Sequence, residues 1–194
     1  MTRGVAARAT AVVMAAAATV PAAPGFARDL LEGRSAVAKI LPPEPGRMAC
    51  YRRMYDERHM AGHPRQTVAE MTFLLRVAGV NANGDPAMSS PVRVNYLFAL
   101  ELRRRGDTRS MATSGDCAGD RAAECVVACD GGGVEIEPRG PGLIVRLRGE
   151  GIALGGDCAT TRGRFVAPGA DDRVFELQPA PMAACRPVAW RLAQ

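Results

Sequence analysis

The chain has 194 residues, a formal net charge of +5 and 47% hydrophobic residues. No apolar segment, the N-terminal one included, reaches the roughly 20 residues that a membrane-spanning helix needs, so stable membrane insertion is not expected. Nearly all basic residues are arginines, and heavy use of Ala, Gly and Pro accompanies them. This skew is typical of a GC-rich genome, so the positive charge does not predict a nucleic-acid partner.

Residues 1–27 have the features of a signal peptide. A basic start leads into the apolar run AVVMAAAATV, and prolines then interrupt any helix. Gly25 and Ala27 occupy the two positions that a signal peptidase inspects, so we expect cleavage after Ala27. Cleavage lowers the net charge from +5 to +3. The mature chain is therefore expected in the bacterial periplasm or outside the cell.

Residues 28–47 are expected to form a flexible lead-in to a single domain, residues 48–194. The lead-in holds a possible short helix, RDLLEGRSAVAKI, followed by LPPEPGR, whose prolines prevent the helix from continuing.

The two histidines of the chain, His59 and His63, lie in YDERHMAGHPRQ. On a continuous helix they would share one face, as metal ligands at i and i+4 do. Asp56 can cap such a helix, but Pro64 disfavours helical backbone at His63, so the helix should end before the second histidine. We therefore predict a capped turn that leads into the first strand. A metal or catalytic site is the alternative, and it would need a carboxylate such as Asp171 or Asp172.

The domain, residues 48–194, is predicted to be all-β. Apolar side chains alternate with polar ones in TVAEMTFLLRV and VRVNYLFALELR, the pattern of strands with one face in a core. The loop NANGDPAMSS between them predicts a hairpin. Weaker strands follow at 107–117, 123–130, 134–138, 142–148, 151–154 and 173–179.

About eight strands joined mainly by short turns predict an antiparallel up-and-down meander, closed as a barrel or, alternatively, folded as a sandwich. If the barrel is hollow, its pocket should be lined by Met71, Phe73, Tyr96 and Phe98. The basic run LRRRGD at 102–107 is interpreted as a solvated turn.

All six cysteines follow the signal segment, and their even number in an exported chain predicts disulfides. On one strand, Cys125 and Cys129 would lie roughly 13 Å apart, too far to bond to each other. Three bridges are predicted among the 15 possible sets: Cys117–Cys125, Cys129–Cys158 and Cys50–Cys185.

The stretches YDERHMAGHPRQTV, CDGGG and DDRVFEL, with the cysteines between them, resemble a group of uncharacterised exported bacterial proteins. The resemblance spans about Cys50 to Cys185 and implies a single secreted β domain with no catalytic residue. Small exported barrels also include lipocalin-like carriers and envelope inhibitors of lysozyme or proteases, an analogy of fold alone.

Three functions follow as expectations. The first is a monomeric, non-enzymatic protein without cofactor that binds a small apolar ligand or an envelope protein. The second is an envelope inhibitor or interaction module with a filled barrel and a projecting loop such as 155–172. The third is a metal-dependent enzyme that uses His59 and His63.

Overall fold

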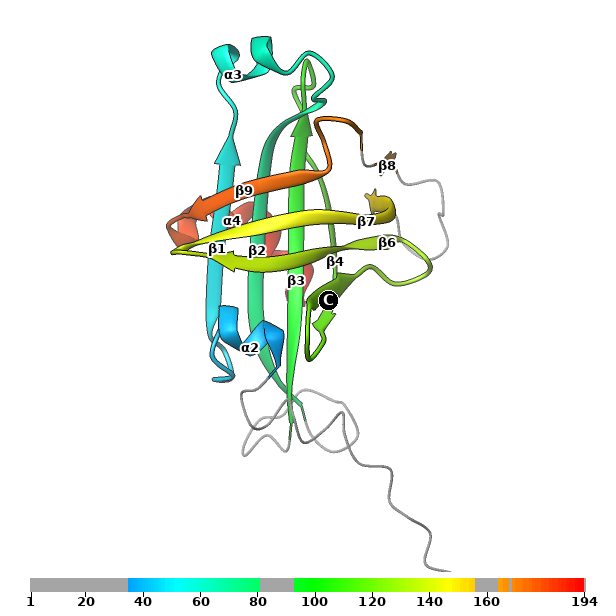
Figure 1. Cartoon of the computed structure of the whole chain (residues 1–194). Helices are drawn as coiled ribbons and strands as arrows, with labels where there is room; N and C mark the ends of the chain where they lie inside the picture. Colours follow the sequence, from blue (N-terminus) through cyan, green and yellow to red (C-terminus); the bar gives the residue numbers. More distant parts are fainter. Residues whose placement is uncertain (1–34, 81–92, 156–163, 168, 194) are drawn as a thin grey trace, which may run out of the picture.

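A computed structural model describes residues 35–80, 93–155, 164–167 and 169–193 (Figure 1). Eight antiparallel strands form a closed barrel, as the alternation predicts, and not a sandwich. They are β1 (Met48–Met54), β2 (Val68–Val80), β3 (Arg93–Arg104), β4 (Met111–Ala118), β5 (Ala123–Val126), β6 (Gly132–Arg139), β7 (Gly142–Leu154) and β9 (Val174–Pro179).

β9 closes the barrel. The strands β1 to β7 pair in chain order, and β9 then lies between β7 and β1. In Figure 1, β6, β7 and β9 cross in front of β1, β2 and β3 at a steep angle. The short β8 (Arg164–Val166) pairs with the far end of β7, beyond the part of β7 that contacts β9. The sheet therefore closes on itself, because β9 pairs with both β1 and β7.

Three strand predictions need correction. β1 was not expected, because its sequence MACYRRM does not alternate clearly. The predicted strands 142–148 and 151–154 are one strand, β7, whose register with β6 shifts near its middle. Gly149 and Gly151 adopt positive φ there, so the strand bends without ending. The predicted strand 123–130 is shorter than expected, since β5 ends at Val126 and Cys129 lies in a turn with positive φ.

The barrel interior is filled by its own side chains. Met71, Phe73, Tyr96 and Phe98 are all 0% exposed, and the rings of Phe73 and Phe98 stack with centroids 5.6 Å apart. A cavity beside these side chains would leave part of their surface accessible to water. The predicted inward orientation is therefore confirmed, but the tight packing argues against a ligand held among these four residues.

The segment before β1 seals one end of the barrel. Helix α2 (Ala36–Ile40) is capped by Ser35, and Val37 and Leu41 are buried in the main core. The Tyr96 hydroxyl donates a hydrogen bond of 2.9 Å to the Leu41 carbonyl. This part of the predicted flexible lead-in is thus packed into the domain, because its apolar residues complete the core at that end.

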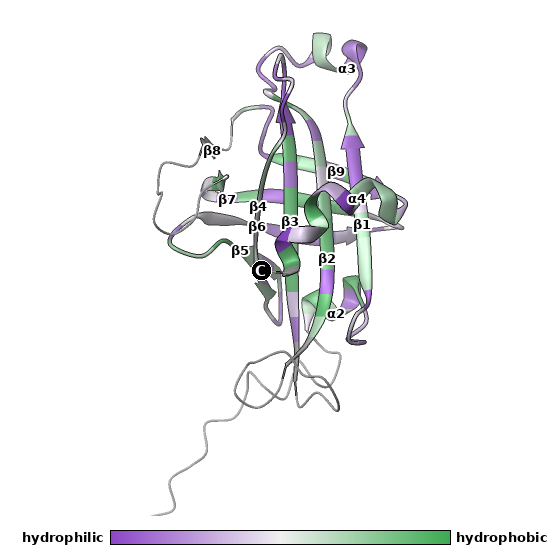
Figure 2. Ribbon diagram, turned by 180° about the vertical axis from the view of Figure 1, so that it is seen from behind, coloured by the Kyte–Doolittle hydropathy of each residue, from purple (hydrophilic) through white to green (hydrophobic). Residues whose placement is uncertain are grey.

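A C-terminal helix that the sequence did not predict covers part of the outer face. α4 (Met182–Ala189) lies across β1, β2 and β3 (Figure 2), and the 3-10 helix η1 (Trp190–Ala193) follows it. Cys185 and Val188 of α4 pack against Leu74 and Ala99, which point outward from the barrel. This second, smaller apolar cluster buries outward-facing residues that would otherwise contact water.

Two of the predicted disulfides are present. Cys50–Cys185 ties β1 to α4 with a Cα–Cα distance of 5.9 Å, and Cys117–Cys125 joins directly paired residues of β4 and β5. None of the described cysteines is free. The third predicted bridge involves Cys158, which lies outside the described residues.

Removing the Cys50–Cys185 bridge should cost more stability than removing Cys117–Cys125. The first closes a span of 135 residues and the second a span of 8. Loop-closure entropy predicts losses of about 5 and about 2.5 kcal/mol in the free energy of unfolding. Urea unfolding of Cys50→Ser/Cys185→Ser and Cys117→Ser/Cys125→Ser proteins measures both. An equal or larger loss from the second pair would contradict the expectation.

Alkaline pH should loosen the contact between Tyr96 and α2. Burial raises the pKa of Tyr96 from 10.0 to about 12, so folding favours the protonated phenol. The stability that Tyr96 contributes is complete below pH 10 and is lost as the pH rises toward 12. Tyr96→Phe should remove this part of the pH dependence and cost about 1 kcal/mol at neutral pH, the worth of one hydrogen bond. An absorbance titration of the folded protein measures the ionisation of its tyrosines. If all of them ionise together near pH 10, the raised pKa of Tyr96 is refuted.

Candidate functional site

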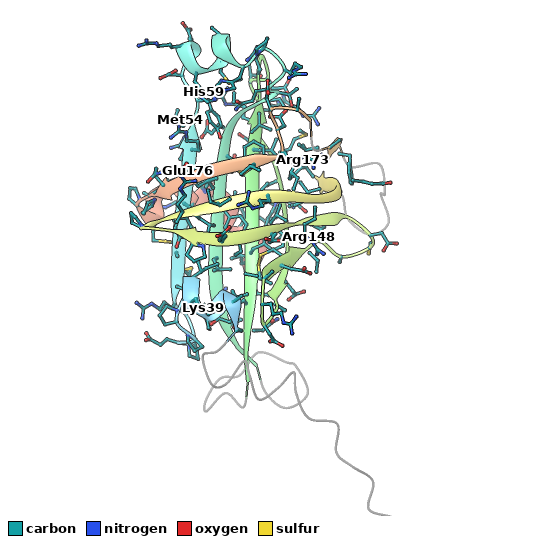
Figure 3. The ribbon with its side chains drawn as sticks, in the orientation of Figure 1. Lys39, Met54, His59, Arg148, Arg173 and Glu176 are labelled. Carbon is teal, nitrogen blue, oxygen red and sulfur yellow. A yellow bond between two sulfur atoms is a disulfide. The ribbon has the colours of Figure 1, made fainter. Side chains whose placement is uncertain are left out.

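The end of the barrel opposite α2 carries most of the residues singled out in the sequence (Figures 1 and 3). We call it the α3 end, and it consists of residues 53–67 with helix α3 (Glu57–Gly62), residues 103–111 and residues 169–173. Hydrogen bonds join these three segments, as described below. They form a rim around the mouth of the barrel.

Helix α3 forms as the sequence predicts. The Asp56 side chain accepts a hydrogen bond of 2.7 Å from the His59 amide, which satisfies a free N–H at the start of the helix. The helix ends at Gly62, and His63 is its C-terminal cap. The predicted capped turn before β2 is therefore confirmed.

Three rings stack along this helix. The Tyr55 and His59 centroids are 4.5 Å apart, and those of His59 and His63 are 4.1 Å apart with an interplanar angle of 16°. The Arg53 guanidinium lies 5.1 Å from the centre of the Tyr55 ring, which extends the column by a cation–π contact. Burial raises the pKa of Tyr55, so its hydroxyl is protonated at neutral pH.

The two histidines do not face a common point. The lone pairs of an imidazole lie in its plane, and two stacked, nearly parallel rings cannot both direct one at the same ion. His59 Nε2 contacts the Oε1 of the buried Gln66 at 2.9 Å, and His63 Nδ1 contacts the His59 carbonyl oxygen at the same distance. Because the amide nitrogen of Gln66 donates to Val68, its oxygen must accept from His59. His59 therefore binds the Gln66 side chain, and His63 binds the backbone of α3.

Asp172 has a structural role at this end of the barrel. Its carboxylate accepts hydrogen bonds from the Thr67 amide, the Thr67 hydroxyl and the Val68 amide at 2.7, 2.6 and 3.1 Å. Asp172 is 2% exposed, whereas its neighbour Asp171 is half-buried. These bonds fix the start of β2 to the segment before β9. In the described part of the chain, no group of three His, Cys, Asp or Glu side chains could hold a metal ion.

In the basic run at 102–107, only Arg105 and Gly106 form the exposed turn that the sequence suggested, because Arg103 and Arg104 belong to β3. Arg103 donates to Glu70 on β2, and Arg104 donates 2.7 Å to the Phe165 carbonyl on β8. Arg105 donates to the Met60 and His63 carbonyls, at the C-terminal end of α3 where a positive charge is favourable. Each arginine thus ties a different segment to the end of β3.

Glu70 joins three strands on the outer face of the barrel. Its carboxylate pairs with Arg52 of β1 and, at 3.1 Å, with Arg103 of β3. The Glu70 side chain is 16% exposed, so water screens these pairs only in part. Sequence reasoning missed this triad, although Glu70 had been placed on the polar face of its strand. Arg52 lies on β1, which was not predicted, so its approach to Glu70 could not be expected.

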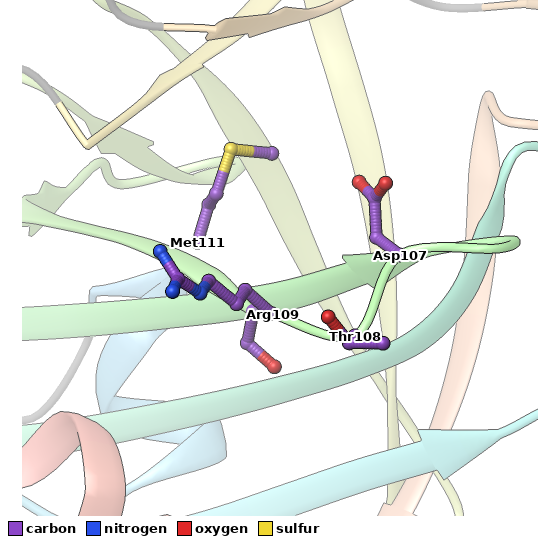
Figure 4. A pocket seen from close by; sticks show the side chains of 5 residues that line it. Asp107, Thr108, Arg109 and Met111 are labelled. Atoms are coloured by element: carbon purple, nitrogen blue, oxygen red, sulfur yellow. The ribbon is translucent and has the colours of Figure 1, made fainter.

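Four surface depressions each include residues of segment 101–112. One, of about 310 Å³, is lined by Asp107–Met111 alone (Figure 4). Another, of about 590 Å³, lies between α3 and the ends of β2 and β3, with Tyr55, Met60, Arg103 and Arg105 among its walls. A third includes Arg104 and Thr67, and a fourth lies beside Trp190 of η1. The connection between β3 and β4 therefore contributes to several depressions of the described surface.

Comparisons with protein family models, with curated proteins and with solved structures gave no match for this chain. Among the described residues, no helix has the length and apolar character to cross a membrane.

Replacing Asp172 by asparagine should destabilise the α3 end. Asp172→Asn keeps the shape of the side chain. It replaces one carboxylate oxygen, which accepts from the Thr67 amide and the Thr67 hydroxyl, by an NH₂ group that can only donate. Loss of bonds to a buried charged group predicts a decrease of about 3 kcal/mol in the free energy of unfolding. Urea unfolding measures it, with Asp171→Asn as the matched control, expected within about 0.5 kcal/mol of the unaltered protein. Equal effects of the two variants would refute the assigned role.

Proposed function

We propose that this protein is a non-enzymatic interaction module that binds a partner protein through the α3 end of its barrel. The observation that carries the proposal is the combination of a filled interior with surface depressions that gather around residues 101–112. A filled barrel leaves its outer surface and its mouth for binding. Of the two non-enzymatic expectations from the sequence, the interaction module therefore has more support than the carrier of a small apolar ligand.

The composition of the α3 end favours an acidic partner. Segments 53–66, 103–109 and 171–173 contain eight arginines and five acidic residues. Asp56 and Asp172 are engaged by backbone amides within the fold. Arg58 and Arg65 are exposed on α3 and on the turn after it. An excess of exposed positive charge steers an acidic surface toward this end and orients it there.

We place the protein in the periplasm or outside the cell. The signal-like segment 1–27 supports this assignment from the sequence. Disulfides that join elements far apart in the chain are consistent with an oxidising compartment. An inhibitor of an envelope enzyme is one kind of module that would act in that compartment.

Site-specific photo-crosslinking tests the proposal. A photoreactive amino acid replaces Arg58 at the α3 end, and a matched protein carries it at Arg47, which is exposed near α2. We expect a discrete crosslinked species in envelope extracts of the source organism from position 58 and not from position 47. Charge reversal by Arg58→Glu/Arg65→Glu should reduce the yield of a crosslink from a third α3-end position, Ala61, by about tenfold or more.

Equal crosslinking from positions 58 and 47, or a yield at Ala61 that charge reversal does not change, would overturn the assignment of the binding surface. All the photoreactive positions lie on the outer surface, because the test compares the two ends of the barrel.

A further inference from the structure

Two arginines point into the barrel at the α3 end. Along β1, Tyr51 faces the main core and Arg52 pairs outward with Glu70, so Arg53 faces inward. Along β3, Phe98, Leu100 and Leu102 belong to the core, and Arg104 continues their face. The strand register places Arg53 opposite Met71, and Met71 opposite Leu102, one inward position before Arg104. Both cations therefore line the same mouth of the barrel, two strands apart.

The outer face shows how such a pair is normally neutralised. Arg52 and Arg103 are the chain neighbours of Arg53 and Arg104, and they occupy the opposite face of the same two strands. Glu70 on the strand between them accepts from both. On the inner face, Met71 pairs with Arg53 and Val68 pairs with Arg104, and neither side chain carries a charge. The inner pair therefore lacks the carboxylate that the outer pair shares.

The surroundings of the inner pair supply few acceptors. The Nε atoms of Arg53 and Arg104 are buried, and neither has a hydrogen-bond partner. Arg53 stacks on Tyr55, and Arg104 uses one terminal nitrogen for the Phe165 carbonyl. Asp172 lies at the same end of the barrel, and its oxygens accept from Thr67 and Val68. A buried guanidinium N–H without an acceptor is costly, and an oxyanion would satisfy it.

We propose that Arg53 and Arg104 form an oxyanion site in the mouth of the barrel, which takes a carboxylate or phosphate group in the position that Glu70 has on the outer face. Planar guanidinium groups match both kinds of oxyanion by paired hydrogen bonds. The Tyr55 ring forms one wall of the site beside Arg53. The inference rests on the proposed function in that it names the chemical group by which the α3 end would recognise an acidic partner.

Nuclear magnetic resonance of the arginine Nε–H groups tests the site without the partner. Inorganic phosphate and acetate are titrated separately into the ¹⁵N-labelled full chain at constant ionic strength. We expect saturable shifts of the Arg53 and Arg104 signals, with a dissociation constant on the order of 1 mM for the preferred anion. The anion that binds with the lower dissociation constant shows whether the site prefers a phosphate or a carboxylate group. Because this measurement uses the unaltered protein, it does not depend on whether a variant folds.

Matched variants separate this site from general attraction to a basic surface. Arg53→Gln and Arg104→Gln should each raise the dissociation constant of the preferred anion by about tenfold or more, because each removes a charged donor. Arg52→Gln and Arg103→Gln remove the same charge from the outer face and should leave the dissociation constant within about twofold. Arg53→Lys, which keeps the charge but lacks Nε, should give an intermediate loss.

An absence of saturable shifts, or equal losses from inner and outer variants, would overturn the oxyanion site. Anion binding that persists while crosslinking at position 58 fails would overturn the proposed partner surface alone. Crosslinking that persists without anion binding would remove the oxyanion site and leave the partner surface standing.

Discussion

The interior of this eight-stranded barrel is filled by its own side chains, and the rest of the structure depends on that packing. Phe73, Phe98 and Phe175 fill the interior, and α2 seals one end. Chemistry is therefore confined to the outer surface and to the remaining mouth. The same packing explains why these aromatic residues stabilise the core and do not line a pocket.

The parts of the fold that were predictable from the sequence are those in which one face of a strand meets water. Met71, Phe73 and Tyr96 alternate with polar residues, and this pattern predicted their inward orientation. β1 was missed because both of its faces are covered. Tyr51 packs into the barrel while its neighbour Cys50 packs under α4, so no alternation remains. Leu74 and Ala99 interrupt the polar faces of their strands for the same reason, and they were the available signal for a covering helix.

The site was predicted less completely than the fold, for a related reason. The cap on α3 depends on Asp56, Gly62 and Pro64, which act locally, and it was predicted. The contacts of Asp172 with Thr67 and of Arg105 with Met60 join segments far apart in the chain. No local pattern encodes them. The different environments of Arg52 and Arg53 follow from the register of three strands, so adjacent and identical residues acquire different surroundings.

The position of β9 has a consequence for how the chain acquires its structure. β9 is the last strand in the sequence, and it pairs with β1, the first. Until residues 174–179 have been synthesised and released, the sheet has two unpaired edges, at β1 and along β7. Contacts between segments so distant in sequence form slowly, and open strand edges invite pairing with other chains. Folding of this barrel is therefore coupled to the completion of the polypeptide, and holding the chain unfolded until then protects it from aggregation.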